Sequence, residues 1–86
     1  MARTIEEIRG TISAARDSVW VVEDSISKIA GGQTPNEELK GNIERNVAHL
    51  KLVTSNQEII DSNENIADLL AAITAGEAKL QEDIWG

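Results

Sequence analysis

Residues 5–32 read IEEIRGTISAARDSVWVVEDSISKIAGG, and this stretch decides the fold. Apolar side chains recur in it at alternating spacings of three and four residues, which is the heptad pattern of a coiled-coil seam. The seam consists of Ile5, Ile8, Ile12, Ala15, Val19, Val22, Ile26 and Ile29. The sequence therefore predicts one long amphipathic helix in this part of the chain.

Capping signals mark both ends of this helix. Thr4 and Glu7 have the spacing at which a hydroxyl and a carboxylate each satisfy a free backbone amide at a helix start. Gly31 and Gly32 follow the last apolar position, and glycine readily adopts the backbone geometry that ends a helix. We therefore predict a helix over residues 4–30, followed by a short glycine turn.

A second helix start follows this turn. Thr34 is predicted to be the N-cap, with Pro35 at the first helical position and Glu37 three residues after the cap. The apolar spacing then continues through Leu39, Ile43, Asn46, Leu50, Val53, Gln57 and Ile60, and shifts to Ile59, Asn63, Ile66, Leu70, Ile73, Glu77, Leu80 and Ile84. The sequence predicts a helix over residues 35–84 whose apolar stripe changes register near residues 53–63.

Two arrangements explain the change of register. Either one long helix exchanges an intrachain partner for an interchain partner, or the chain breaks near residues 61–63 and a third helix folds back. A capping box between Asp61 and Glu64 favours the break, whereas the lack of Gly and Pro at this point favours a continuous or kinked helix. We place the continuous helix slightly ahead, with a further weak break at residues 74–76 left open. The predicted fold class is all-α, a helical hairpin or bundle forming a single domain over residues 1–86.

Composition limits the classes of partner. The 86 residues carry a net charge of −7, which argues against direct binding to nucleic acid or to an anionic membrane. The apolar runs are too short to span a bilayer, and the N-terminus lacks the apolar core of a signal peptide. We therefore expect a protein partner and a cytoplasmic location, or a virion if a phage encodes the chain.

Residues that could carry catalysis or bind a metal are sparse. The chain has no Cys, and its single imidazole, His49, has no carboxylate at helical contact spacing. Asp61, Asn63 and Asn65 resemble the first half of an EF-hand calcium loop, but Ile66 stands at the required Gly and Ala72 at the required Glu. We predict no enzyme, no metal and no cofactor.

The helix seams are the predicted interface. If Ile5 takes heptad position a, the β-branched residues at a and d favour trimers or larger oligomers over dimers. An antiparallel core within one chain is about equally compatible with the pattern. Trp20 lies outside the seam and suggests a second contact surface, or a wider buried stripe. The predicted interface residues are Ile5, Ile8, Ile12, Val19, Trp20, Val22, Ile26, Ile29, Ile66, Leu70, Ile73, Leu80, Ile84 and Trp85.

Two short pieces of the second seam carry a local resemblance. Ile43 with Asn46, and Ile60 with Asn63, look like the Ile-x-x-Asn layers of trimeric coiled-coil stalks in bacterial adhesins and phage fibres. The Thr that often follows this Asn is replaced by Val47 and Glu64. The resemblance implies a structural role in a virion or surface fibre. Our first functional hypothesis is accordingly a non-enzymatic assembly protein that oligomerises through coiled-coil helix faces.

A second hypothesis rests on charge. The segment from Leu52 to Ala78 contains no Lys or Arg, and it holds the predicted acidic face Glu58, Asp61, Glu64 and Asp68. The spacing of Asp61, Glu64 and Asp68 would place them on one side of a continuous helix. Such a face is usually solvated, but it would also suit a small acidic regulator that binds a basic protein target.

Overall fold

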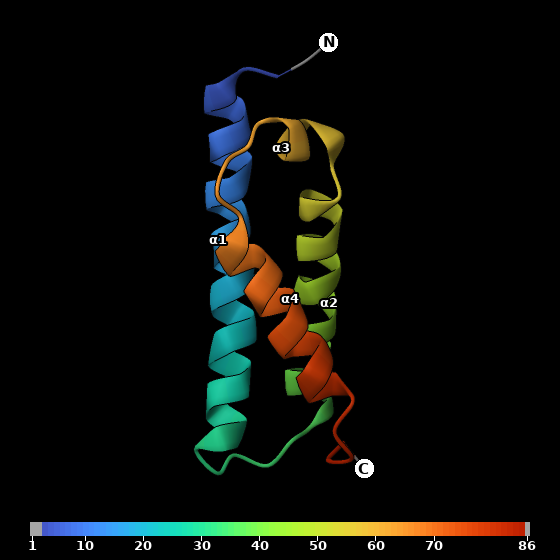
Figure 1. Cartoon of the computed structure of the whole chain (residues 1–86). Coiled ribbons are helices and arrows are strands. Elements are labelled where there is room, and N and C mark those ends of the chain that lie inside the picture. The colour runs from blue at the N-terminus through green and yellow to red at the C-terminus, as the bar shows by residue number, and fades with distance from the viewer. Residues whose placement is uncertain (1–2, 86) are drawn as a thin grey trace.

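The computed structural model describes residues 3–85, and the regular secondary structure in this range consists of helices alone. Its elements are α1 (Ile5–Ala30), α2 (Glu37–Thr54), the short α3 (Gln57–Asp61) and α4 (Ala67–Leu80). Helix α2 runs antiparallel to α1, α3 crosses one end of the pair, and α4 returns along the groove between them (Figure 1). The result is a bundle about 45 Å long and 18 Å wide, so the predicted all-α bundle is confirmed.

The sequence signals for α1 are confirmed at both ends. The Thr4 hydroxyl accepts a hydrogen bond from the Glu7 amide, and the Glu7 carboxylate accepts one from the Thr4 amide. Gly31 forms the C-cap, and Gly32 has a φ of 104°, a conformation that side-chain-bearing residues rarely adopt. These glycines turn the chain toward α2.

The predicted start of α2 is wrong by two residues. Asn36, not Thr34, is the N-cap, and its side-chain oxygen accepts a hydrogen bond of 2.8 Å from the Leu39 amide. Asn caps a helix at least as well as Thr, and Asn36 has the extended backbone that an N-cap requires. Pro35 therefore lies before the cap instead of at the first helical position.

The slightly favoured continuous or kinked helix over residues 35–84 is wrong, and the alternative, a break near residues 61–63 after which a further helix folds back, is confirmed. Helix α2 ends at Thr54, Asn56 caps α3, and the chain reverses between Asp61 and Ala67. The predicted capping box of Asp61 with Glu64 does not form, because the turn is made by Asn63 in a left-handed conformation with a φ of 58°. Helix α4 then continues without interruption through residues 74–76, so the proposed weak break there is absent.

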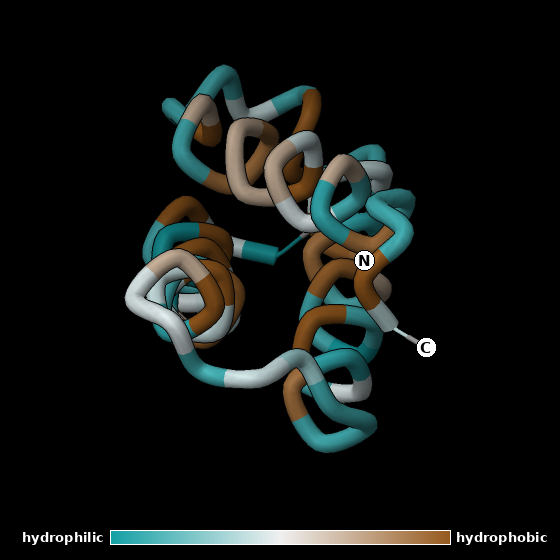
Figure 2. Tube along the Cα trace, turned by 90° about the horizontal axis from the view of Figure 1, so that it is seen from below, coloured by the Kyte–Doolittle hydropathy of each residue, from teal (hydrophilic) through white to brown (hydrophobic). Residues whose placement is uncertain are grey.

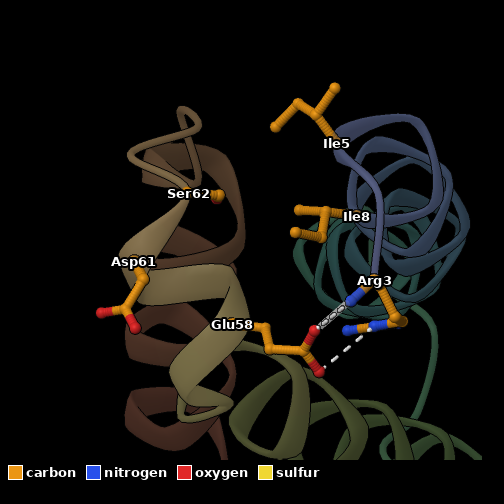
Figure 3. Close-up of a pocket in the computed structure, with 6 residues that line it drawn as sticks. All are labelled: Arg3, Ile5, Ile8, Glu58, Asp61 and Ser62. Atoms are coloured by element: carbon orange, nitrogen blue, oxygen red, sulfur yellow. Dashed lines mark hydrogen bonds and ion pairs between the residues drawn. The ribbon is translucent and has the colours of Figure 1, made fainter. Parts of the chain in front are cut away.

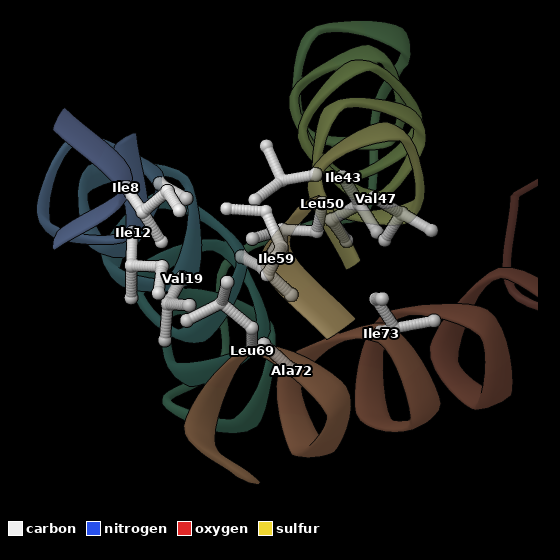
Figure 4. Close-up of a cluster of buried hydrophobic side chains, with 13 residues drawn as sticks. Ile8, Ile12, Val19, Ile43, Val47, Leu50, Ile59, Leu69, Ala72 and Ile73 are labelled. Carbon is white, nitrogen blue, oxygen red and sulfur yellow. The ribbon is translucent and has the colours of Figure 1, made fainter. Parts of the chain in front are cut away.

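The core explains why α4 folds back. Apolar side chains from all four helices point toward one another along the bundle axis (Figure 4). They include most of the α1 seam together with residues of the later helices: Ile8, Ile12, Ala15, Val19, Val22, Ile43, Val47, Leu50, Val53, Ile59, Leu69, Ala72 and Ile73. Along each helix, hydrophobic segments alternate with hydrophilic ones that face outward (Figure 2). The heptad seam of α1 therefore packs against the chain's own helices.

Helix α4 packs especially closely at Gly76. A Cβ atom added there would lie 2.5 Å from Val47 Cγ2, 3.2 Å from Val22 Cγ1 and 3.3 Å from Ile43 Cγ2. These distances are shorter than ordinary carbon–carbon contacts of about 3.5–4.0 Å. The absence of a side chain at Gly76 thus lets α4 sit deep in the groove between α1 and α2.

Candidate functional site

The predicted acidic face does not exist as one helix face. Because the helix breaks, Glu58 and Asp61 belong to α3, Glu64 lies in the following turn, and Asp68 is in the first turn of α4. The structure also pairs most of these carboxylates with arginines of the N-terminal part of the chain. Arg3 pairs with Glu58, Arg9 with Glu64 and Arg16 with Asp68.

These three ion pairs form a row that joins α1 to the returning segment. The Arg3 amide donates to Glu58 Oε2 at 2.7 Å, and Arg16 Nε donates to Asp68 Oδ2 at 2.8 Å. The hydrogen bond from Arg16 holds the pKa of the Asp68 carboxyl below its usual value. Because partly exposed ion pairs are weak, we assign the row a role in orienting α3 and α4, not a large share of stability. It leaves Asp61 as the member of the predicted face that makes no ion pair within residues 3–85.

A depression of about 320 Å³ opens at the α3 end of the bundle. Its apolar wall is made by Ile5 and Ile8, and the opposite wall by Asp61 and Ser62, with the pair of Arg3 and Glu58 at one side (Figure 3). Ile5, predicted as a seam residue, is 43 % exposed here. Arg3 and Glu58 pair with each other, so Asp61 is the one charged residue of this depression without an ion pair among the described residues.

The polar residues singled out for catalysis or metal binding do not converge. His49 lies exposed on α2 and shares a depression with Glu58, but that carboxylate already pairs with Arg3. Among the residues described, no three acidic, His or Cys side chains gather closely enough to hold a metal ion. The geometry therefore directs attention to contact surfaces.

The predicted interface residues divide into two groups. Ile73 is buried, and Ile26, Ile66, Leu80 and Trp85 pack against the core, with Trp85 Nε1 donating a hydrogen bond of 3.1 Å to the Lys79 carbonyl. By contrast, the Trp20 side chain on α1 is 66 % exposed and Leu70 on α4 is 49 % exposed. Ile29 and Ile84 are intermediate. Of the two tryptophans predicted as interface residues, Trp20 is thus the one whose side chain is exposed to a partner.

Sequence reasoning missed Leu52, which is 73 % exposed on α2. A signal for it was present, because Leu52 falls between Leu50 and Val53 and so lies off the seam of its helix. It also missed the three paired arginines, because Arg3 before α1 and Arg9 and Arg16 on it are six and seven residues apart, and this spacing becomes informative only once the opposing segment is placed.

Comparison with known protein families, curated proteins and solved structures finds no match. None of the helices within residues 3–85 is both long enough and apolar enough to cross a bilayer. The exposed surface around Trp20 must therefore be judged by its own chemistry.

Two depressions on the surface of the bundle share one lining residue, Glu23, and Trp20 lines the first of them. The first, of about 380 Å³, is lined by Trp20, Glu23, Asp24 and Ser27 of α1. The second, of about 290 Å³, lies between α1 and α4 and is lined by Glu23, Asp68, Ala71, Ala72 and Ala75. The two depressions, which meet at Glu23, are here called together the Trp20 groove; Trp20 lines the first, and the small side chains of Ala71, Ala72 and Ala75 line the second.

Proposed function

We propose that this protein is a non-enzymatic assembly subunit that binds other proteins through apolar side chains on the outside of its helical bundle. The observation that carries the proposal is the exposure of Trp20, which remains 66 % accessible in the middle of the longest helix. Trp is enriched at protein interfaces and among the residues that dominate their binding energy.

The packing of the core bears on how the exposure of Trp20 is interpreted. The seam of α1 from Ile8 to Val22 is buried against the other helices, and no side-chain N or O atom buried within the described part of the chain lacks a hydrogen-bond partner. If core residues of the bundle were left exposed, a further helix or a second copy would be needed to cover them. The large apolar residues outside this core, Trp20 among them, are exposed and open to recognition.

Self-association is the second form of this proposal. Leu70, at 49 % exposure, belongs to the stripe expected to join copies, and Ile60 and Ile5 are exposed at the α3 end of the bundle. A trimer or larger oligomer would have to use these outer residues, because opening the core would sacrifice the burial of Ile8 and Val22. A subunit of a phage particle or of another large complex would suit either form.

Mass in solution distinguishes the two forms. Light scattering coupled to size exclusion, over a wide range of concentration, should show a stable oligomer if the copies assemble. Replacing Leu70 with Gln should then reduce the mass, whereas the exposed Gly10→Ala, which meets nothing within 4 Å, serves as a control.

If the protein is a monomer, the proposal requires a different protein as partner. Proteins captured with the wild-type chain and lost with Trp20→Ala would be purified and their affinities measured directly. A monomer for which no purified protein shows binding that depends on Trp20, Leu52 or Leu70 would refute the proposed function.

A further inference from the structure

Carboxylates surround Trp20 on α1. Asp17 lies three residues before it, and Glu23 and Asp24 lie three and four residues after it. Residues at these spacings are neighbours on a helix surface, about 5–6 Å apart between Cβ atoms. Arg16, four residues before Trp20, is the one basic neighbour at such a spacing, so the exposed indole lies in a mostly acidic field, and Glu23 and Asp24 also line the depression beside it.

The positive charges nearest to this field are already engaged. Arg16, one turn before Trp20, donates to Asp68 across the groove, and Lys28 Nζ lies 3.0 Å from Asp24 Oδ2. Asp17 and Glu23 take part in no ion pair within residues 3–85. The surface around Trp20 thus presents an aromatic face and two unpaired carboxylates, Glu23 in the groove and Asp17 next to it on the helix, while the neighbouring cations Arg16 and Lys28 are held in ion pairs.

The α4 side of the groove completes the surface. Ala71 and Ala75 line it, and both side chains end at Cβ, so they leave room for a partner's backbone or aliphatic stem. Lysine and arginine combine such a stem with a cationic head. The head can stack on the indole or pair with a carboxylate while the stem covers the small residues.

We propose that the Trp20 groove docks a basic segment of a partner protein, with lysine or arginine side chains set against Trp20, Asp17 and Glu23. This assignment rests on the proposed function and specifies that the partner protein presents basic side chains. A second copy of this chain does not fit, because it carries a net charge of −7. Most of its cations are also held in ion pairs of their own: Arg3, Arg9, Arg16, Lys28, Lys51 and Lys79.

The test is a titration of the isotope-labelled full chain with a short amphipathic peptide made of Lys, Leu and Ala, followed by heteronuclear NMR. A peptide with Glu in place of every Lys is the matched control. We expect the basic peptide to shift the indole resonance of Trp20 and the amide resonances of the residues that line the groove. The indole resonance of Trp85, whose Nε1 donates a hydrogen bond to the Lys79 carbonyl, should stay unchanged.

Variants separate the contributions of the ring and the charges. Trp20→Ala should weaken binding at least about tenfold, and Asp17→Asn or Glu23→Gln about two- to fivefold each, with a flatter dependence on salt. Gly10→Ala, at an exposed position of α1 where an added Cβ meets nothing within 4 Å, should leave the affinity unchanged. All four positions are exposed, so the circular dichroism spectrum should stay that of the wild type.

Three results would overturn the inference. They are the absence of a shift at Trp20, equal shifts with the acidic peptide, and shifts at Trp20 that follow protein concentration without any peptide, which would identify a second copy as the occupant. A neutral or acidic partner that binds through Trp20 would also refute it, while leaving the proposed function intact.

Discussion

Gly76 offers the sharpest test of how α4 is packed. Replacing it with Ala adds one methyl group, which would lie 2.5 Å from Val47 Cγ2 on the facing helix. Val47 is 5 % exposed and β-branched, so it has little freedom to rotate away, and either α4 or α2 must move by about 1 Å. Overpacking of this kind costs about 1–3 kcal/mol.

The same substitution also favours the helix, because Ala has a helix propensity about 1 kcal/mol better than Gly. Gly10→Ala isolates that gain, since Gly10 lies within α1 and nothing comes within 4 Å of its added Cβ. In urea unfolding followed by circular dichroism, the free energy of unfolding of Gly76→Ala should therefore be about 1–3 kcal/mol lower than that of Gly10→Ala. Each kcal/mol corresponds to roughly 4–8 °C in melting temperature for a domain of this size.

A double variant identifies the clash. Val47→Ala removes the methyl group that the new Cβ would meet, so adding Gly76→Ala to it should cost less than in the wild-type background. Equal stabilisation by Gly76→Ala and Gly10→Ala would refute the close approach of α4 to α2, as would a penalty that Val47→Ala leaves unchanged.

Three further outcomes follow from the chain reversal and its ion pairs. Asn63→Ala should lower the unfolding free energy by about 1 kcal/mol because Asn63 has a φ of 58°, and Asn63→Gly should be tolerated; equal effects in urea unfolding would contradict this. Arg16 lowers the folded-state pKa of Asp68. The pair therefore adds to the free energy of unfolding at pH values above the unfolded-state pKa, and this contribution is lost as the pH falls through the folded-state pKa. The small difference in unfolding free energy between wild type and Asp68→Asn should accordingly vanish in acid. Truncation after Ile60 removes Leu69 and the rest of α4 from the core and should abolish cooperative thermal unfolding, and a stable hairpin would contradict that expectation.

Local signals were sufficient for α1 and for the glycine turn that follows it. The capping box of Thr4 and Glu7 and the glycine turn each involve residues close in sequence, so their hydrogen bonds and backbone angles could be predicted without knowing the tertiary structure. The spacing of Ile8, Ile12 and Val19 likewise predicted which face of α1 is buried. It did not predict what covers that face, because a seam that binds another copy and one that binds α4 have the same periodicity.

The reversal before α4 was harder to predict because its turn is made by Asn instead of Gly or Pro. Asn63 adopts a left-handed conformation that Asn tolerates, and Asn56 caps α3 through a hydrogen bond of 2.9 Å to the Glu58 amide. Both residues could also occupy polar positions on a continuous helix. The free energy that decides between these alternatives comes from burying Leu69 and Ile73 against α1 and α2, which is a tertiary effect.

The acidic surface shows how the reversal changes the assignment of function. On a continuous helix, Glu64 and Asp68 would be free for a partner, whereas the folded-back chain sets them against Arg9 and Arg16. Pairing with Asp68 also engages Arg16, the cation one turn before Trp20. The same event that neutralises the predicted acidic face therefore leaves Asp17 and Glu23 as unpaired carboxylates beside an exposed indole, which moves the expected site of a basic partner from α3 and α4 to the outer surface of α1.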